Sequence, residues 1–456
     1  FIKEFILMQK EIFNELLEKP FVIVAGAGIS MLAPASIPGW WDFNNILKEI
    51  IFKKAFKQLP EIKNQLESTL KSTKIPVTAF SDIIVNSIAG SSYFKLLELL
   101  EGNAPNANHY SLGSLVKDKK ILSIITTNFD TLIEQAFRKE EIHISVYSTE
   151  DDFSSLENSY PNILKIHGSV TNKETFIDTV TQKYKGLNKH KKFHLQSITS
   201  KYPLVFIGFS GNDYIFEKDY IPIKGNQNNP IYWVVRKGSS LNEDLLAILK
   251  ASGREYKIIE EDLPDFFVKL GIEIKKDITN GKEDIDYSVI EKEVDSFFDQ
   301  PHISGWGCIA IIYDILYKLA KINELNQLTD IIQEVLLEKN CEIDIVQTVL
   351  LTKLAINKMM KQEYNSALIL NNLNIKIWEE ISQRQTSYEE IKENKNNQST
   401  IYNNIGLCYI ELGQYREAFN CFSKSIELCE ETKNMKNIVI SKFNIARFTY
   451  LYCTKD

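Results

Sequence analysis

Seven short apolar segments restrict the fold of this chain more than any other feature of its sequence. Each segment is followed by helix-like sequence, and they lie at residues 21–25, 121–126, 143–147, 162–166, 204–208, 231–235 and 256–259. Short strands that alternate with helices are typical of an α/β protein with a parallel sheet and right-handed crossovers. The segment at 121–126 is almost wholly apolar, as expected of a strand that is buried on both faces.

Three of the predicted strands end in residues that can carry chemistry. The first is followed by a glycine-rich turn and Ser30, the second by Asn128 and Asp130, and the fourth ends before His167. Because ligands bind at the carboxyl ends of parallel strands, we expect these residues to meet over one bound molecule. A glycine pair beside an amide, a carboxylate and an imidazole favours a dinucleotide, and hence a Rossmann-like domain.

Gly26 and Gly28 are the candidate phosphate-binding residues. We expect a turn with positive φ at this point, followed by a helix whose N-terminus offers free N–H groups to phosphate oxygens. Ser30 could donate to the same phosphate. However, the segment is shorter than the G-x-G-x-x-G fingerprint, and a tight strand–helix turn explains it equally well.

The other candidates also have structural interpretations. Asn128 and Asp130 could cap a helix predicted over residues 129–137, and His167 could be a satisfied histidine at a strand end. For His109, which lies near a predicted helix start, we favour the structural role.

A further glycine-rich strand end covers residues 206–213. The backbone amides around Gly208 and the hydroxyl of Ser210 could hold a ribose or a phosphate, and Asp213 belongs to the same candidate site. A serine hydrolase is disfavoured, because the nucleophile elbow G-x-S-x-G requires a glycine where Asn212 stands.

The order of patterns predicts a sheet domain, a helical linker and a helical-repeat domain, over residues 1–275, 276–340 and 341–456. Helical patterns also precede the first strand and form an insertion between the first two strands. These predicted helices cover residues 2–18, 42–57, 60–71, 79–100 and 109–116.

The C-terminal part contains a pattern typical of tetratricopeptide repeats. Residues 404–422 place small residues, Leu-Gly, Tyr415, Ala418 and Phe422 at the expected offsets, and a weaker copy upstream has Asn371 in place of the last aromatic residue. We expect residues 394–404, rich in Asn and Lys, to form a loop between repeats. A further unit starts at residue 444, and an uncapped last repeat exposes an apolar face that more chain or a partner would cover.

Composition excludes several classes of function. The net charge is −7, which disfavours nucleic acid as the main ligand, and no segment is long and apolar enough for a membrane span. All six cysteines lie at or after Cys308, none in a CxxC pair, and we expect a reducing cytoplasm. No pattern predicts a metal site.

Five motifs together resemble the sirtuin-like (SIR2-type) family, in the order that this family uses. They lie at residues 26–30, 37–40, 127–130, 165–168 and 208–210. The resemblance covers about residues 20–270 and implies NAD as the ligand. It implies that Asn128 positions the nicotinamide ribose and a water, that Asp130 contacts the carboxamide, and that His167 is the general base. The other NAD-binding residues that it implies are Ala25, Gly26, Ala27, Gly28, Ser30, Trp40, Gly208, Ser210 and Asp213.

Two departures from the deacetylating sirtuins are visible. Those enzymes carry a zinc module with two CxxC pairs between the histidine and the Gly-x-Ser strand, where this chain has no cysteine. They also have an Asp-Phe-Arg sequence where Trp40, Trp41 and Asp42 stand here. Both departures resemble the bacterial anti-phage branch of the family, in which sirtuin-like NAD hydrolases are often followed by helical-repeat sensor regions.

The resemblance therefore implies an NAD hydrolase that acts in abortive-infection defence. Its helical repeats would sense a phage protein or another protein partner, and homo-oligomerisation is expected on family grounds. Two alternatives remain open from the sequence: an NAD-dependent protein deacylase, and a non-catalytic NAD or ADP-ribose sensor.

Overall fold

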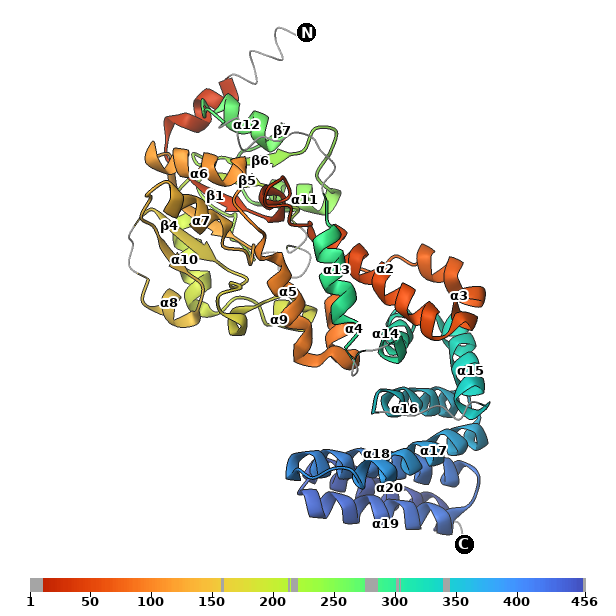
Figure 1. Ribbon diagram of the computed structural model, residues 1–456. Helices are drawn as coiled ribbons and strands as arrows, with labels where there is room; N and C mark the ends of the chain where they lie inside the picture. Colours follow the sequence, from red (N-terminus) through yellow and green to blue (C-terminus); the bar gives the residue numbers. More distant parts are fainter. Residues whose placement is uncertain are drawn as a thin grey trace. The chain divides into compact units, whose positions relative to one another are not determined.

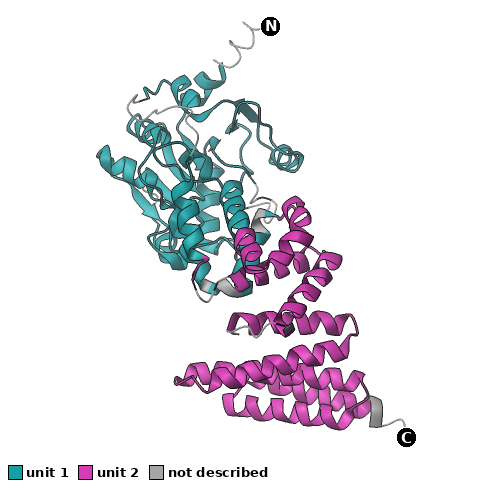
Figure 2. Cartoon of the chain, turned by 45° about the vertical axis from the view of Figure 1, so that its right-hand side comes forward, with its two compact units in different colours: residues 1–50, 76–297 teal, residues 51–75, 298–456 magenta. Residues whose placement is uncertain are grey.

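The computed structural model describes residues 11–156, 160–211, 214, 220–274, 286–300, 303, 305–338 and 345–453 (Figure 1). The chain divides into two compact units (Figure 2). Unit 1 comprises residues 1–50 and 76–297, and unit 2 comprises residues 51–75 and 298–456. The chain therefore enters unit 2 twice.

Unit 1 contains a seven-stranded parallel sheet with the strand order β3-β4-β2-β1-β5-β6-β7. This confirms the predicted Rossmann-like α/β class. The strands are β1 (Phe21–Ala25), β2 (Ile121–Thr126), β3 (Ser145–Tyr147), β4 (Asn162–Lys165), β5 (Leu204–Ile207), β6 (Ile231–Val235) and β7 (Tyr256–Glu260).

The central strand β1 places three loops side by side. Its last residue, Ala25, pairs with Thr126 of β2 on one side and with Ile207 of β5 on the other. The strand order changes direction at β1, which is the position where open α/β sheets bind ligands. The loops that follow β1, β2 and β5 therefore border one crevice.

Apolar side chains of β1 pack alternately on the two faces of the sheet, because successive strand residues point to opposite faces. Phe21 and Ile23 join a core with helices α6 (Ala107–Lys117), α7 (Leu132–Lys139) and α12 (Leu263–Lys269). Val22 and Val24 join the opposite core with α8 (Glu150–Ser154), α10 (Lys189–Thr199) and α11 (Glu243–Ala251). A helix at residues 11–18 contributes Phe13 and Leu16 to the first core.

The insertion after β1 is helical but less regular than predicted. It begins with α2 (Trp40–Gln58), α3 (Pro60–Ser72) and α4 (Val77–Ile84). The predicted helix over residues 79–100 is wrong in its second half, because a π turn (Val85–Ala89) and a 3₁₀ turn (Gly90–Tyr93) interrupt it. Gly90 has a φ of 50°, which a continuous α-helix does not allow. The short α5 (Phe94–Leu97) and another 3₁₀ turn (Glu98–Glu101) follow.

Unit 1 also contains α9 (Val180–Lys185) and α13 (Ser288–Phe297), and every regular element in the described part of unit 2 is a helix. Residues 51–75, with α3, pack within unit 2, where Gln327 of α15 donates to Gln65. The C-terminal helices are α14 (Gly305–Lys318), α15 (Ile322–Glu338), α16 (Ile345–Met360), α17 (Tyr364–Ser382), α18 (Tyr388–Glu411), α19 (Tyr415–Thr432) and α20 (Met435–Cys453).

The tetratricopeptide pattern corresponds to the helix pair α18–α19. A Cβ atom on Gly406 would lie 2.6 Å from the ring of Phe422, so the small residue of the pattern makes room for the aromatic residue. The predicted loop over residues 394–404 is wrong, because this segment lies within α18. Asn394 is buried there and donates to Trp378 O (3.1 Å), so tertiary packing overrides its low helix propensity.

No helix in the described part of the chain combines the length and the apolar character that crossing a membrane requires.

Candidate active site

The glycine turn after β1 packs directly on the loop after β5. Gly26 N donates to Ile207 O (3.0 Å) and Gly28 N donates to Gly208 O (2.9 Å). A Cβ atom at Gly26 would lie 2.5 Å from Gly208 O, and one at Gly28 would lie 2.7 Å from Gly208 Cα. Close approach of two backbones therefore requires both glycines. The expected positive φ is wrong, since Gly26 has a φ of −114°; Gly208 is the residue with a positive φ, 57°.

The helix that was expected directly after the glycine turn is also absent. A single 3₁₀ turn (Ala27–Ser30) follows Gly26, and residues up to the start of α2 at Trp40 form no other helix. Pro34 and Pro38 interrupt any helix that would continue from this turn, because proline has no backbone N–H and disfavours helical backbone in the residue before it. The segment therefore offers no helix dipole for a phosphate.

Ser30 is the centre of a buried hydrogen-bond cluster. Its Oγ donates to Asp130 Oδ2 (3.1 Å), accepts from Asn128 Nδ2 (3.4 Å) and lies 3.1 Å from His109 Nε2. His109 Nδ1 accepts from Asn106 N (3.0 Å), so the neutral ring carries its proton on Nε2 and donates it to Ser30. The cluster brings together three predicted site residues from the loops after β1 and β2.

His109 has both the structural role that we favoured and a contact with the site. It completes a capping box with Asn106 at the start of α6. Burial lowers the pKa of His109 to about 3, so the ring is neutral near neutral pH. Sequence reasoning missed its contact with Ser30, because no local pattern connects residues 79 positions apart.

Asp130 is the unusual carboxyl group of the site. Burial raises the pKa of Asp130 to about 6, although the Lys165 ammonium and a hydrogen bond from Leu132 N (3.0 Å) lower it. Leu132 is the first residue of α7, which starts three residues later than the predicted start at Phe129. The N-cap position belongs to Thr131, which makes no side-chain cap hydrogen bond, so neither Asn128 nor Asp130 is the N-cap residue. Asp130 therefore titrates close to neutral pH beside the cleft.

A cleft opens above this cluster. Five of the predicted site residues line it, namely Ala27, Ser30, Trp40, Asn128 and Asp130. The Trp40 ring packs edge-on against Phe129, with 5.8 Å between the ring centroids, so that the wall of the cleft is aromatic at this point. Ile37, Pro38, Phe43, Leu100 and Thr127 complete the lining together with Phe129.

His167 follows β4 but does not line the cleft. It is only 2% exposed, and its ring lies 6.3 Å from the ring of Phe129 and 5.4 Å from that of Tyr220. Phe129 thus contacts both Trp40 in the cleft and His167 behind it. The turn at Gly168, with a φ of 96°, allows His167 O to accept from Ile177 N (2.9 Å) and anchors the histidine backbone.

The remaining predicted site residues that the structure describes belong neither to the hydrogen-bond cluster of Ser30 nor to the lining of the cleft. Ala25 ends β1 and is fully buried, and Gly208 lies against the glycine turn. Ser210 is exposed in the loop after β5, and Asp213 lies outside the described residues. Within the part of the chain that the structure describes, no group of three or more His, Cys, Asp or Glu side chains could hold a metal ion.

The parallel sheet, its crevice beside β1 and the close-packed glycine turn define a Rossmann-like type of α/β protein. A SIR2-like domain is found over residues 122–256 and a tetratricopeptide repeat over residues 399–431. The SIR2-like match includes Asn128, Asp130 and His167. No curated protein sequence matches the chain.

Solved structures of sirtuins are similar to this chain at low identity. One, described under "Structural Basis for the Mechanism and Regulation of Sir2 Enzymes", is 14% identical, with 57% of this chain and 94% of that chain covered and a TM-score of 0.30. Sir2Tm bound to a propionylated peptide is 14% identical, with 57% of this chain and 96% of that chain covered and a TM-score of 0.30. Sir2 bound to an acetylated peptide has 15% identity with coverage of 57% and 96% and a TM-score of 0.30.

Proposed function

We propose that this chain hydrolyses NAD, with release of nicotinamide and formation of ADP-ribose. The observation that carries the proposal is the buried cluster of Ser30, Asn128 and Asp130, which borders a cleft next to the glycine turn. The SIR2-like match over residues 122–256 supports an NAD-related function for the same region.

The proposed chemistry needs few protein groups. Nicotinamide is cationic when bonded to ribose and leaves as a neutral molecule, so no acid has to protonate it. The ribose is left as an oxocarbenium-like cation that a water captures. Asn128 would orient the ribose and the water, and this orientation can lower the barrier by several kcal/mol. Asp130 would contact the carboxamide of nicotinamide.

His167 would accept the proton of the attacking water, because an imidazole has an ordinary pKa near neutrality. In the structure the ring is buried against Phe129 and Tyr220. Its role as a base therefore requires one of these rings to move aside when NAD enters the cleft. Under this proposal, the conformation in which Phe129 and Tyr220 cover His167 is the one without NAD.

The helical repeats supply the proposed regulation. Unrestrained loss of NAD would kill the host cell, so the activity needs a switch. We propose that the repeats of unit 2 recognise a phage protein or another protein partner, that the chain assembles into a homo-oligomer in the cytoplasm, and that NAD loss then aborts infection. Solenoid surfaces bind proteins along their concave face, which supports this role.

The test is nicotinamide release by purified full-length protein, alone and mixed with extract of phage-infected cells. We expect release by the wild type and by the matched control His143→Ala, which alters an exposed histidine. Asn128→Ala and His167→Ala should lose it. Intact NAD under all these conditions, with His167→Ala indistinguishable from the wild type, would contradict the proposal. Release that depends on an added acyl-lysine peptide would identify a deacylase instead.

A further inference from the structure

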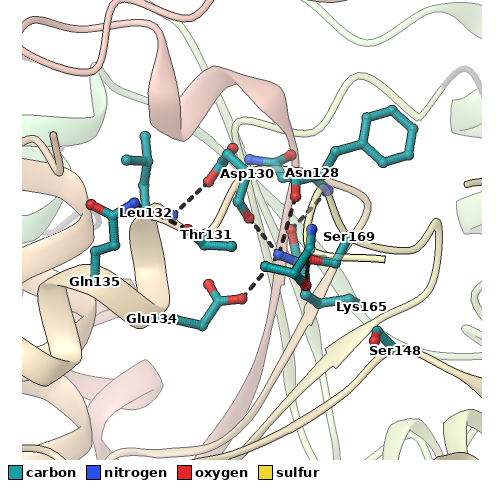
Figure 3. Close-up of polar contacts among 12 residues, drawn as sticks. Asn128, Asp130, Thr131, Leu132, Glu134, Gln135, Ser148, Lys165 and Ser169 are labelled. Carbon is teal, nitrogen blue, oxygen red and sulfur yellow. Dashed lines mark hydrogen bonds and ion pairs between the residues drawn. The ribbon is translucent and has the colours of Figure 1, made fainter. Parts of the chain in front are cut away.

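Lys165, the last residue of β4, has a buried ammonium group directly beneath the cleft. Its side chain is 1% exposed. Figure 3 shows it between Glu134 and the segment that carries Asn128 and Asp130. The ammonium donates to Asp130 O, to Phe129 O (3.4 Å) and to Glu134 Oε1 (2.9 Å). A lysine has three donors, so each of its protons has an acceptor.

Two of these acceptors are backbone oxygens of the segment that forms the cleft floor. This segment runs from the end of β2 at Thr126 to the start of α7 at Leu132 and has no regular secondary structure. Other backbone groups of this segment also form hydrogen bonds: Phe129 O accepts from Val170 N (3.0 Å), and Asn128 N donates to Thr126 Oγ1 (3.1 Å). Lys165 contributes a charged group to these contacts from outside the segment, and charge-assisted hydrogen bonds are the stronger kind.

Stability alone explains this arrangement poorly. Burying a lysine and a carboxylate removes two charges from water, and a well-packed apolar pair in their place is often neutral or stabilising. The Lys165–Glu134 pair does, however, specify where two carbonyl groups must lie. These carbonyls flank the Asp130 side chain and follow directly after Asn128.

We propose that Lys165 is a positioning residue that holds the backbone of Phe129 and Asp130 and thereby directs the Asn128 and Asp130 side chains into the cleft. This inference rests on the proposed NAD hydrolysis for its effect on turnover. Its effect on the backbone is independent of that function.

The charges around Asp130 give the proposal a second readout. Lys165 lowers the pKa of Asp130, Glu134 raises it, and Ser30 donates to the carboxylate. His109, which contacts Ser30, is neutral because burial lowers its pKa to about 3. Loss of the Lys165 charge should therefore raise the pKa of Asp130. Because the ionised carboxylate is the form that accepts a hydrogen bond from the carboxamide N–H of nicotinamide, the acid limb of the pH–rate profile should then move to higher pH.

Arg254 provides a matched control, because it lies near the amino ends of the strands, whereas the cleft lies at their carboxyl ends. It is also a buried cation that holds backbone carbonyls, with donors to Asn229 O (2.5 Å), Thr199 O (2.7 Å) and Tyr202 O (2.7 Å). These carbonyls precede the amino ends of β5 and β6, away from the cleft. Arg254→Met should therefore weaken the fold without altering the cleft floor.

The experiment compares Lys165→Met, Lys165→Arg and Arg254→Met in the full-length chain. The readouts are amide hydrogen exchange over residues 127–132 and nicotinamide release as a function of pH. For Lys165→Met we expect faster exchange in this segment, a kcat about tenfold lower, and an acid limb about one pH unit higher. Lys165→Arg should recover part of each, and Arg254→Met should change neither the segment's exchange nor the pH profile.

A double variant, Lys165→Met with Glu134→Met, removes both charges and guards against failure to fold. Faster exchange over residues 127–132 in this folded variant supports the proposal, even where the wild type releases no nicotinamide. Unchanged amide exchange over residues 127–132 in Lys165→Met and in the double variant would overturn the positioning role of Lys165. If the wild type leaves NAD intact but the amide hydrogens of residues 127–132 exchange faster in the Lys165 variants, the proposed NAD hydrolysis is refuted and the positioning role of Lys165 stands.

Discussion

Asp130 shows, at the scale of one residue, how a candidate site conflicts with folding stability. An ionised carboxylate that is buried loses its hydration, and the cost is only partly offset by the partners that it finds. Ser30, Lys165 and the Leu132 amide all contact Asp130 or lower its pKa, yet that pKa remains raised to about 6. Such a group at a cleft is a candidate for function, because a stable fold would not require it.

The first prediction concerns Asp130→Asn. Because the pKa in the folded protein is raised from 3.8 to about 6, the stability that Asp130 contributes is present below pH 4 and is lost as the pH rises through 6. The shift corresponds to about 3 kcal/mol. We therefore expect Asp130→Asn to be more stable than the wild type at pH 7.5, and the difference to shrink towards pH 4. Urea unfolding at the two pH values measures this.

The control is Asp118→Asn, which alters an exposed carboxylate, and its stability relative to the wild type should not change with pH in this way. A lower stability of Asp130→Asn at pH 7.5 would show that the carboxylate stabilises the folded state.

The second prediction concerns Gly28, whose place is determined by the backbone of Gly208. A Cβ atom at residue 28 would lie 2.7 Å from Gly208 Cα, which no side-chain rearrangement relieves. We expect Gly28→Ala to lose about 2 kcal/mol or more of unfolding free energy and to separate the two loops. Gly39→Ala is the control, since its Cβ would have 3.7 Å to its nearest neighbours. Equal unfolding midpoints for the two variants would contradict this explanation.

Much of the candidate site could be predicted from the sequence at this scale. Strand ends in a parallel sheet meet, so the gathering of Ser30, Asn128 and Asp130 follows from the strand pattern. The contributions of His109 and Lys165 could not be predicted, because their partners are distant in the chain and their burial is a property of the tertiary structure. The prediction that Gly26 and Gly28 provide a positive φ was wrong for the same reason. Their close contact with Gly208 depends on a residue far along the chain and leaves no pattern in the sequence near the turn.

At the scale of elements, apolar patterning predicted the strands and most helices, but not their interruptions. Strands buried on both faces have a dense apolar pattern that a short window detects. The break in the helix at residues 85–93 and the continuous helix across residues 394–404 depend on contacts with residues that are distant in the sequence, which a short stretch of sequence does not include. Element type therefore follows from local sequence, and continuity follows from packing.

The third prediction concerns α17, which precedes the tetratricopeptide repeat. Asn371 occupies the position of Phe422 in the predicted weaker copy of the repeat pattern. It is fully buried, and neither of its side-chain polar atoms has a hydrogen-bond partner among the described residues. Leucine has the same branched shape without polar atoms, so we expect Asn371→Leu to raise the unfolding free energy by about 1–3 kcal/mol. Urea unfolding of the full-length chain measures the change.

The matched comparison is Asn394→Leu in α18. This asparagine is also buried, but its Nδ2 donates to Trp378 O (3.1 Å), and its replacement leaves that carbonyl without this donor. Asn394→Leu should therefore be destabilising, opposite in sign to Asn371→Leu. Destabilisation by both substitutions would indicate that a buried water satisfies Asn371.

At the scale of the whole molecule, the sequence order of the segments does not correspond to the two compact units. Residues 51–75 follow the glycine turn by only two dozen positions, yet they belong to unit 2 with residues 298–456 (Figure 2). In α3, Ile62, Leu66 and Leu70 are buried on one face. Deletion of the C-terminal helices would therefore remove packing partners as well as the repeats.

The fourth prediction follows from this division. A chain that ends at residue 297 lacks α15, which packs against α3, so we expect Ile62, Leu66 and Leu70 to become exposed. Exposed apolar faces bind hydrophobic dyes and aggregate. Dye fluorescence and light scattering of the truncated chain should therefore exceed those of the full-length chain, and any altered NAD loss in cells would reflect misfolding as well as lost sensing.

The triple substitution of Ile62, Leu66 and Leu70 by serine separates these causes, because its effect should change sign between the two chains. In the full-length chain it removes buried apolar side chains and should cost roughly 2 kcal/mol or more per residue. In the truncated chain it should lower dye binding and aggregation, because the same side chains are exposed there. A truncated chain that is monomeric and binds no dye without the substitutions would mean that α3 does not depend on the C-terminal helices. In that case truncation would be a clean test of whether the repeats control NAD loss.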